Sequence, residues 1–184
     1  MIRRIALGVL AAPLIIRPTL AQQASPGVER AQAPNQSHSP AQAASADQAR
    51  QQALGGMAFA LATSQVAERM AQAAPVKLFA TLEAEEQTTF ANVRQRAGLP
   101  APRPENMNAQ QQQMLAQLQG LRGGEFDRMY VRGQVDGHQE LLRLHQAISS
   151  NPANQQEEII ATLAVPAIKS HIAMLQGISN AIGG

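Results

Sequence analysis

The sequence predicts an all-α protein whose folded part is an antiparallel four-helix bundle. Two observations lead to this fold class. The composition is rich in Ala, Leu, Gln, Met and Glu and contains only four Phe and one Tyr, which favours helices over strands. Long stretches of helical periodicity are separated by Pro and Gly, and neither strand-like alternation nor a tight hairpin signal occurs.

The first 21 residues have the pattern of a cleavable secretory signal peptide. Arg3 and Arg4 are followed by an apolar run, Ile5 to Ile16, which is too short to cross a bilayer. Thr19 and Ala21 are the small residues that a signal peptidase requires. We therefore expect a mature chain that begins at Gln22, is exported to the periplasm and keeps no transmembrane anchor. The chain has no cysteine that would carry a lipid.

Composition excludes several classes of function. Three of the fifteen Lys and Arg residues leave with the signal, so twelve remain against thirteen acidic residues, a net charge of −1. The remaining arginines form no basic stripe, and we expect no nucleic-acid partner. Without cysteine, the chain has no disulfide, no thiolate catalysis and no Cys-based zinc site. No nucleophile motif is present either, so no catalytic residue is predicted.

Residues 22–44 carry Gln, Ala, Ser and Pro without apolar periodicity, which predicts a disordered leader before a bundle domain at 45–184. Ser45 is the predicted N-cap of the first helix, Pro75 starts the second, and Gly98 with the following prolines stops it. Gly55 and Gly56 indicate a bend in the first helix. The predicted helices are 45–74, 75–97, a short one at 109–121, 125–150 and 154–182.

Helical periodicity assigns an apolar face to each long helix from the second onward. The predicted core residues are Phe79, Phe90, Val93 and Ala97 on the second; Phe126, Tyr130, Gly133, Gly137, Leu141, Leu144 and Ile148 on the third; and Ile160, Leu163, Ala164, Ala167, Met174, Leu175 and Ile178 on the fourth. Gly133 and Gly137 predict the close approach of a neighbouring helix. Pro166 predicts a kink in the last helix.

Several ionisable residues fall on these apolar faces. The bundle should direct inward Glu83, Glu86, Asp127, His138 and His171, with Glu68 and His145 as weaker members. One interpretation is structural: Asp127, Tyr130, His138 and His171 form buried hydrogen bonds that fix helix register. The other is a metal site, of iron or manganese, built from Glu83, Glu86, His138 and His171. The Glu-x-x-His spacing that a metal pair requires is missing.

The stretch Gly124 to Tyr130, with His138, Thr162-Leu163, Pro166 and His171 further on, resembles the bacterial ferritin-like family named domain of unknown function 4142. Val76 to Ala80 and Leu99-Pro100 extend the resemblance. The family often has Asp-His in the second helix and Glu after a Gly pair in the first. Here the corresponding residues are Glu86-Gln87 and Met57 to Ala60. The resemblance implies an exported, ferritin-like four-helix fold and no established reaction.

These observations lead to two functional hypotheses. The first is a non-catalytic structural or interaction module that meets an unknown protein or envelope partner and needs no cofactor. The alternative is a ferritin-like protein that binds iron or manganese through an incomplete carboxylate and histidine site. Stoichiometric metal retained by the purified protein would separate the two.

Overall fold

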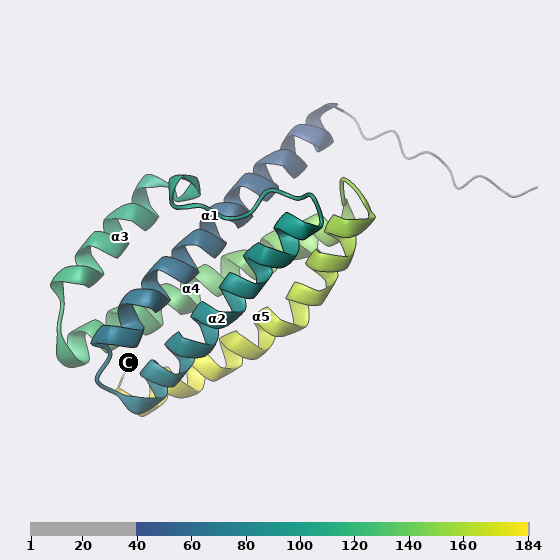
Figure 1. Ribbon diagram of the computed structural model, residues 1–184. Coiled ribbons are helices and arrows are strands. Elements are labelled where there is room, and N and C mark those ends of the chain that lie inside the picture. The colour runs from purple at the N-terminus through teal and green to yellow at the C-terminus, as the bar shows by residue number, and fades with distance from the viewer. Residues whose placement is uncertain (1–39, 184) are drawn as a thin grey trace, which may run out of the picture. The chain divides into compact units, whose positions relative to one another are not determined.

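The computed structural model describes residues 40–183, and this part of the chain is helical without strands. The elements are α1 (Pro40–Met70), α2 (Ala74–Arg96), the 3₁₀ turn η1 (Pro104–Asn106), α3 (Ala109–Gly120), α4 (Gly123–Ser150) and α5 (Gln155–Ala181). The all-α prediction is confirmed (Figure 1). The predicted signal peptide and nearly all of the predicted leader lie outside the described residues.

Local sequence explains most helix boundaries. Pro75 lies in the first turn of α2, where its missing N–H costs no hydrogen bond. Asn108 caps α3 by accepting from Gln111 N, and the Gln111 side chain accepts from Asn108 N in return. Asn154 caps α5 in the same way, by accepting a hydrogen bond from Glu157 N.

The bounds of α1 differ from the prediction at both ends. The helix begins at Pro40, so Ser45 lies inside it and is not its N-cap. It ends at Met70 rather than at residue 74. The amides of Gln72 and Ala73 donate to the Asp127 carboxylate of α4, which turns the chain away from the helix axis before α2 begins.

Each long helix runs antiparallel to its neighbours in the bundle. Along α1 and α4 the residue numbers run in opposite directions, since Gly56 meets Leu141 and Ser64 meets Tyr130. The connections after α1 and α4 are short, whereas α2 is joined to α4 by a long crossover that contains η1 and α3. Bundles of ferritin-like connectivity also have one long crossover. Figure 1 shows α3 outside the four long helices, beside α1.

Glycines serve close packing in this bundle. A Cβ atom on Gly55 would lie 2.6 Å from the Asn106 carbonyl oxygen, and one on Gly56 would lie 2.8 Å from Leu141 Cδ2. The Gly pair therefore admits the crossover and α4 against an uninterrupted helix, and the expected functional meaning of a bend is replaced by close approach. Gly133 similarly admits the Met114 sulfur of α3, which would lie 2.9 Å from a Cβ atom there.

The predicted core faces need correction on α2 and α5. Val93 is 47% exposed and Leu163 is 64% exposed, and Met174 is exposed as well. On α5 the buried residues are instead Ile160, Ala161, Ala164, Ile168 and Leu175, with Glu157 at the first turn. α5 is apolar around much of its circumference, so several positions satisfy the helical period and periodicity alone assigns the wrong ones. By length and composition α5 would also suffice to span a membrane, a test that signal sequences and core helices pass too.

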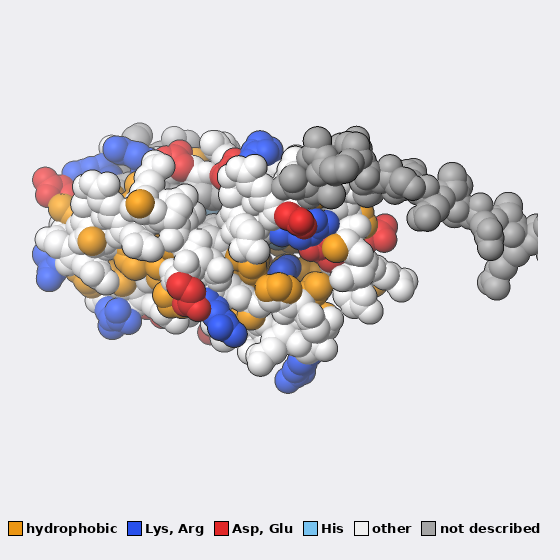
Figure 2. Space-filling model, turned by 90° about the horizontal axis from the view of Figure 1, so that it is seen from above, with side chains coloured by type: hydrophobic (Ala, Val, Ile, Leu, Met, Phe, Trp, Pro, Cys, Tyr) orange, Lys and Arg blue, Asp and Glu red, His pale blue; other side chains and the backbone are white. Residues whose placement is uncertain are grey.

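Charged side chains are dispersed over the surface. On the face seen in Figure 2, Lys and Arg alternate with Asp and Glu and form no continuous basic patch. This distribution agrees with the small net charge of the chain and gives no support to nucleic-acid binding.

Candidate metal centre

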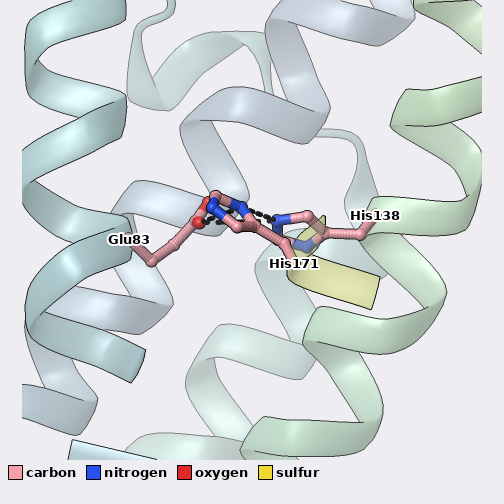
Figure 3. Close-up of side chains that lie close together, drawn as sticks. All are labelled: Glu83, His138 and His171. Atoms are coloured by element: carbon pink, nitrogen blue, oxygen red, sulfur yellow. Dashed lines mark hydrogen bonds and ion pairs between the residues drawn. The ribbon is translucent and has the colours of Figure 1, made fainter. Parts of the chain in front are cut away.

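Three side chains from three helices meet in the core: Glu83 of α2, His138 of α4 and His171 of α5 (Figure 3). Glu83 Oε2 lies 3.0 Å from His171 Nδ1 and 3.4 Å from His138 Nε2. The two ring nitrogens, His138 Nε2 and His171 Nδ1, are 3.2 Å apart. Glu83 is 0% exposed and His138 is 1% exposed, while His171 lies at the edge of the core. The carboxylate and two imidazoles thus form a compact buried triangle of donor atoms.

A second layer of contacts orients each of the three side chains. Gln87, one helical turn after Glu83, donates its amide N–H to Glu83 Oε1 at 2.9 Å and leaves Oε2 directed at the histidines. His138 Nδ1 bonds to the Gln134 carbonyl oxygen at 2.8 Å. Because a carbonyl only accepts, the proton of neutral His138 lies on Nδ1 and Nε2 presents a lone pair. His171 Nε2 lies 3.3 Å from Glu86 Oε2, a partly exposed carboxylate.

The Glu83 carboxylate is incompletely satisfied by protein groups. Although two ring nitrogens lie close to Oε2, neither contact has the direction of a hydrogen bond, and Oε2 makes none within residues 40–183. A buried carboxylate oxygen without a hydrogen bond is rare in folded proteins and calls for a bound cation or water.

Electrostatics keep Glu83 ionised and His171 protonated at neutral pH. Burial alone would raise the pKa of Glu83, but the contacts with His138 and His171 outweigh burial and lower that pKa to about 2. Burial alone would lower the pKa of His171, but Glu83 and Glu86 raise it to about 10. The metal-free site therefore contains a charged His171 between two carboxylates, and a metal ion would have to displace its Nδ1 proton.

The size of the donor triangle matches a metal coordination face. An ion about 2.1 Å from each ligand places neighbouring ligand atoms about 3.0 Å apart in octahedral and about 3.4 Å apart in tetrahedral geometry. The three observed separations run from 3.0 to 3.4 Å. Two imidazoles and one carboxylate are a ligand set for a first-row divalent ion, and three protein ligands leave positions open.

The other residues singled out from the sequence lie elsewhere. Asp127 is buried, but it accepts from Gln72 N and Ala73 N at the start of α2 and does not join His138. Tyr130 is buried and bonds Ser64 Oγ at 2.8 Å, and burial raises the pKa of its phenol. Glu68 is half-buried beside a surface depression and stays outside the triangle. His145 is buried, and its Nδ1 bonds the Leu141 carbonyl oxygen.

Sequence analysis missed the residues that hold the site in place. Gln87 appeared only as a departure from the related family, although it lies four residues after Glu83 and therefore on the same helix face. Gln134 donates to Thr63 Oγ1 at 2.8 Å, which ties α4 to α1 beside the site. Phe79 separates the site from the α2–α5 surface, with its ring centre 6.0 Å from that of His138 and 5.7 Å from that of His171.

Comparison with known proteins confirms the resemblance inferred from the sequence. The family model described as Domain of unknown function (DUF4142) matches residues 31–178, which span all three residues of the triangle. No curated protein and no solved structure matches the chain significantly. The match indicates no catalytic family.

Proposed function

The chain belongs to the family described as domain of unknown function DUF4142, and we propose that its helical bundle binds one divalent metal ion through Glu83, His138 and His171. Iron and manganese are the first candidates, because the ligand set combines imidazole nitrogen with a hard carboxylate oxygen. Glu86 would orient His171 from the second layer. The domain is non-catalytic in this proposal, since no residue suited to act as a nucleophile lies at the triangle.

The observation that carries the proposal is the unsatisfied Oε2 atom of Glu83. It is buried, faces two ring nitrogens at 3.0 and 3.4 Å, and makes no hydrogen bond in the described part of the chain. A metal ion at the centre of the triangle would satisfy this oxygen and both nitrogens together. The second-layer contacts of Gln87, Gln134 and Glu86 have the arrangement that fixes ligand orientation in metal sites.

The structural interpretation competes for the same residues. In that reading, His171 carries a proton, pairs with Glu83 and Glu86, and fixes the register of α5 against α2. The sequence alone favoured this reading because it could not show that three ligands converge on one point. The convergence, together with the unsatisfied oxygen, now favours metal binding.

Equilibrium dialysis against Mn(II) and Co(II) tests the proposal. The wild-type domain should bind close to one ion, and Co(II) should give visible ligand-field bands. Glu83→Gln keeps the volume of the side chain but removes its charge, and should weaken Mn(II) binding at least 10-fold. Glu85→Gln, an exposed carboxylate two residues further along α2, is the matched control and should bind as the wild type does. Equal binding by both variants, or none by the wild type, would rule out this site.

We also propose an exported location and an unidentified protein or envelope partner. The support for export is the Arg3-Arg4, apolar and Thr19-Leu20-Ala21 pattern of the first 21 residues. Support for a partner comes from the exposed apolar side chains of α2 and α5, which include Leu78, Leu163 and Met174. Co-purification after cross-linking in periplasmic extracts would identify such a partner.

A further inference from the structure

A second polar feature of the core adjoins the Glu83 carboxylate. A small void of about 10 Å³ has apolar walls from all four long helices, formed by Met57, Phe90, Leu141 and Ile168. Its polar lining consists of Glu86, Gln87 and His145. A space of this size accommodates one water molecule.

The polar atoms available to this void are acceptors. Gln87 is 7% exposed, and because its amide N–H donates to Glu83 Oε1, its Oε1 atom points to the other side. That Oε1 makes no hydrogen bond within residues 40–183. His145 is buried, and its Nδ1 bonds the Leu141 carbonyl oxygen, which leaves Nε2 for the void. Burial lowers the pKa of His145, so its ring is neutral and Nε2 accepts.

A lining of acceptors requires a donor. A buried amide oxygen without a partner costs about 1 to 3 kcal/mol, so an empty void would leave the core with an avoidable penalty. Water supplies two donors from a single atom and fits the available volume. The other polar group of the lining, Glu86, is already in contact with His171 Nε2.

We propose that this void binds one ordered water molecule, which donates to Gln87 Oε1 and His145 Nε2 and so makes Gln87 and His145 positioning residues for Glu83. The chain of contacts runs from the Leu141 carbonyl through His145, the water and Gln87 to Glu83 Oε1. The role of this chain in metal binding rests on the proposed function above, whereas the presence of the water does not.

Four variants measure the coupling: Gln87→Met, His145→Phe, the double variant, and His145→Gln, whose amide reaches the position of Nε2. Each of the first two should weaken Mn(II) binding about 10-fold, the usual scale for outer contacts of a metal site. Because both act through the same water, the double variant should lose about 10-fold as well, and His145→Gln should recover most of the affinity. Independent residues would instead give a multiplicative loss of about 100-fold, and that result would overturn the proposal.

Two controls separate this proposal from a general loss of structure. Gln139→Met exchanges an exposed glutamine of α4 and should leave Mn(II) affinity unchanged. Urea unfolding of each metal-free variant must show a cooperative transition before its affinity is compared. If Gln139→Met weakens binding as strongly as Gln87→Met does, the positioning role is wrong.

A high-resolution crystal structure of the metal-free protein tests the water directly. The proposal predicts one density peak about 2.8 to 3.0 Å from both Gln87 Oε1 and His145 Nε2. An empty void, or a cation about 2.1 to 2.4 Å from both atoms, would contradict it. If the wild type binds no Mn(II), the metal function and the positioning role fail together, and the density still decides whether the water is bound.

Discussion

Asp127 should be the strongest single polar contributor to the junction between α1 and α2. Its carboxylate accepts N–H groups from Gln72 at 3.1 Å and from Ala73 at 2.8 Å, and the side chain is buried. Hydrogen bonds to a charged group contribute about 1.5 to 3 kcal/mol each. Both donors lie in a partly solvated connection, which favours the lower end of that range. Asp127→Ala should therefore lower the free energy of unfolding by about 3 kcal/mol.

Asp127→Asn refines this test. Its amide keeps one acceptor oxygen, so it retains one of the two bonds and should cost about half as much, roughly 1.5 kcal/mol. The assay is urea unfolding of the metal-free domain followed by circular dichroism. Asp136→Ala removes an exposed carboxylate of the same helix and should change stability by less than about 0.5 kcal/mol. A loss below about 1 kcal/mol for Asp127→Ala, or equal losses for Ala and Asn, would refute the reasoning.

Three further predictions concern pH, packing and processing. In the metal-free protein, stability should rise from pH 2 to 4.5, because folded Glu83 binds its proton less tightly than the unfolded chain, and should fall from pH 6.5 towards 10, because folded His171 holds its proton more tightly. Urea midpoints across pH check this, and His171→Gln should remove the alkaline decline. Gly55→Ala should destabilise the fold through its clash with the crossover backbone, whereas Gly177→Ala, with open space around it, should stabilise α5 by about 0.5 to 1 kcal/mol, and thermal melts compare the two. Intact-mass analysis of the exported protein should give a chain that starts at Gln22, and a mass that includes the first 21 residues would refute signal cleavage.

The helices could be predicted from sequence because their boundaries depend on local chemistry. Pro75, the Asn108 cap and the Asn151-Pro152 break act within a few residues, and each marks the end or start of a helix in the structure. The first helix was misplaced for the opposite reason. Its end is decided by Asp127, more than 50 residues away, and no local signal shows that contact.

The candidate site was only partly predictable. Glu83, Glu86, His138 and His171 share apolar helix faces, which a 3.6-residue period reveals. Their height along the bundle depends on how far α2, α4 and α5 slide past each other, which periodicity does not contain. Three of the four meet at one point, and Glu86 contacts that group from the surface side. Gln87 went unrecognised because a glutamine beside a glutamate reads as a solvated helix face until the orientation of α2 is known.

Anomalous diffraction from crystals soaked in Mn(II) tests the central claim most directly, because it locates the ion instead of inferring it from affinity. We predict one peak in each bundle, about 2.0 to 2.3 Å from Glu83 Oε2, His138 Nε2 and His171 Nδ1. Absence of a peak at this point after soaking at millimolar Mn(II), with the three side chains still in mutual contact, would contradict the account and establish the cluster as a structural ion pair.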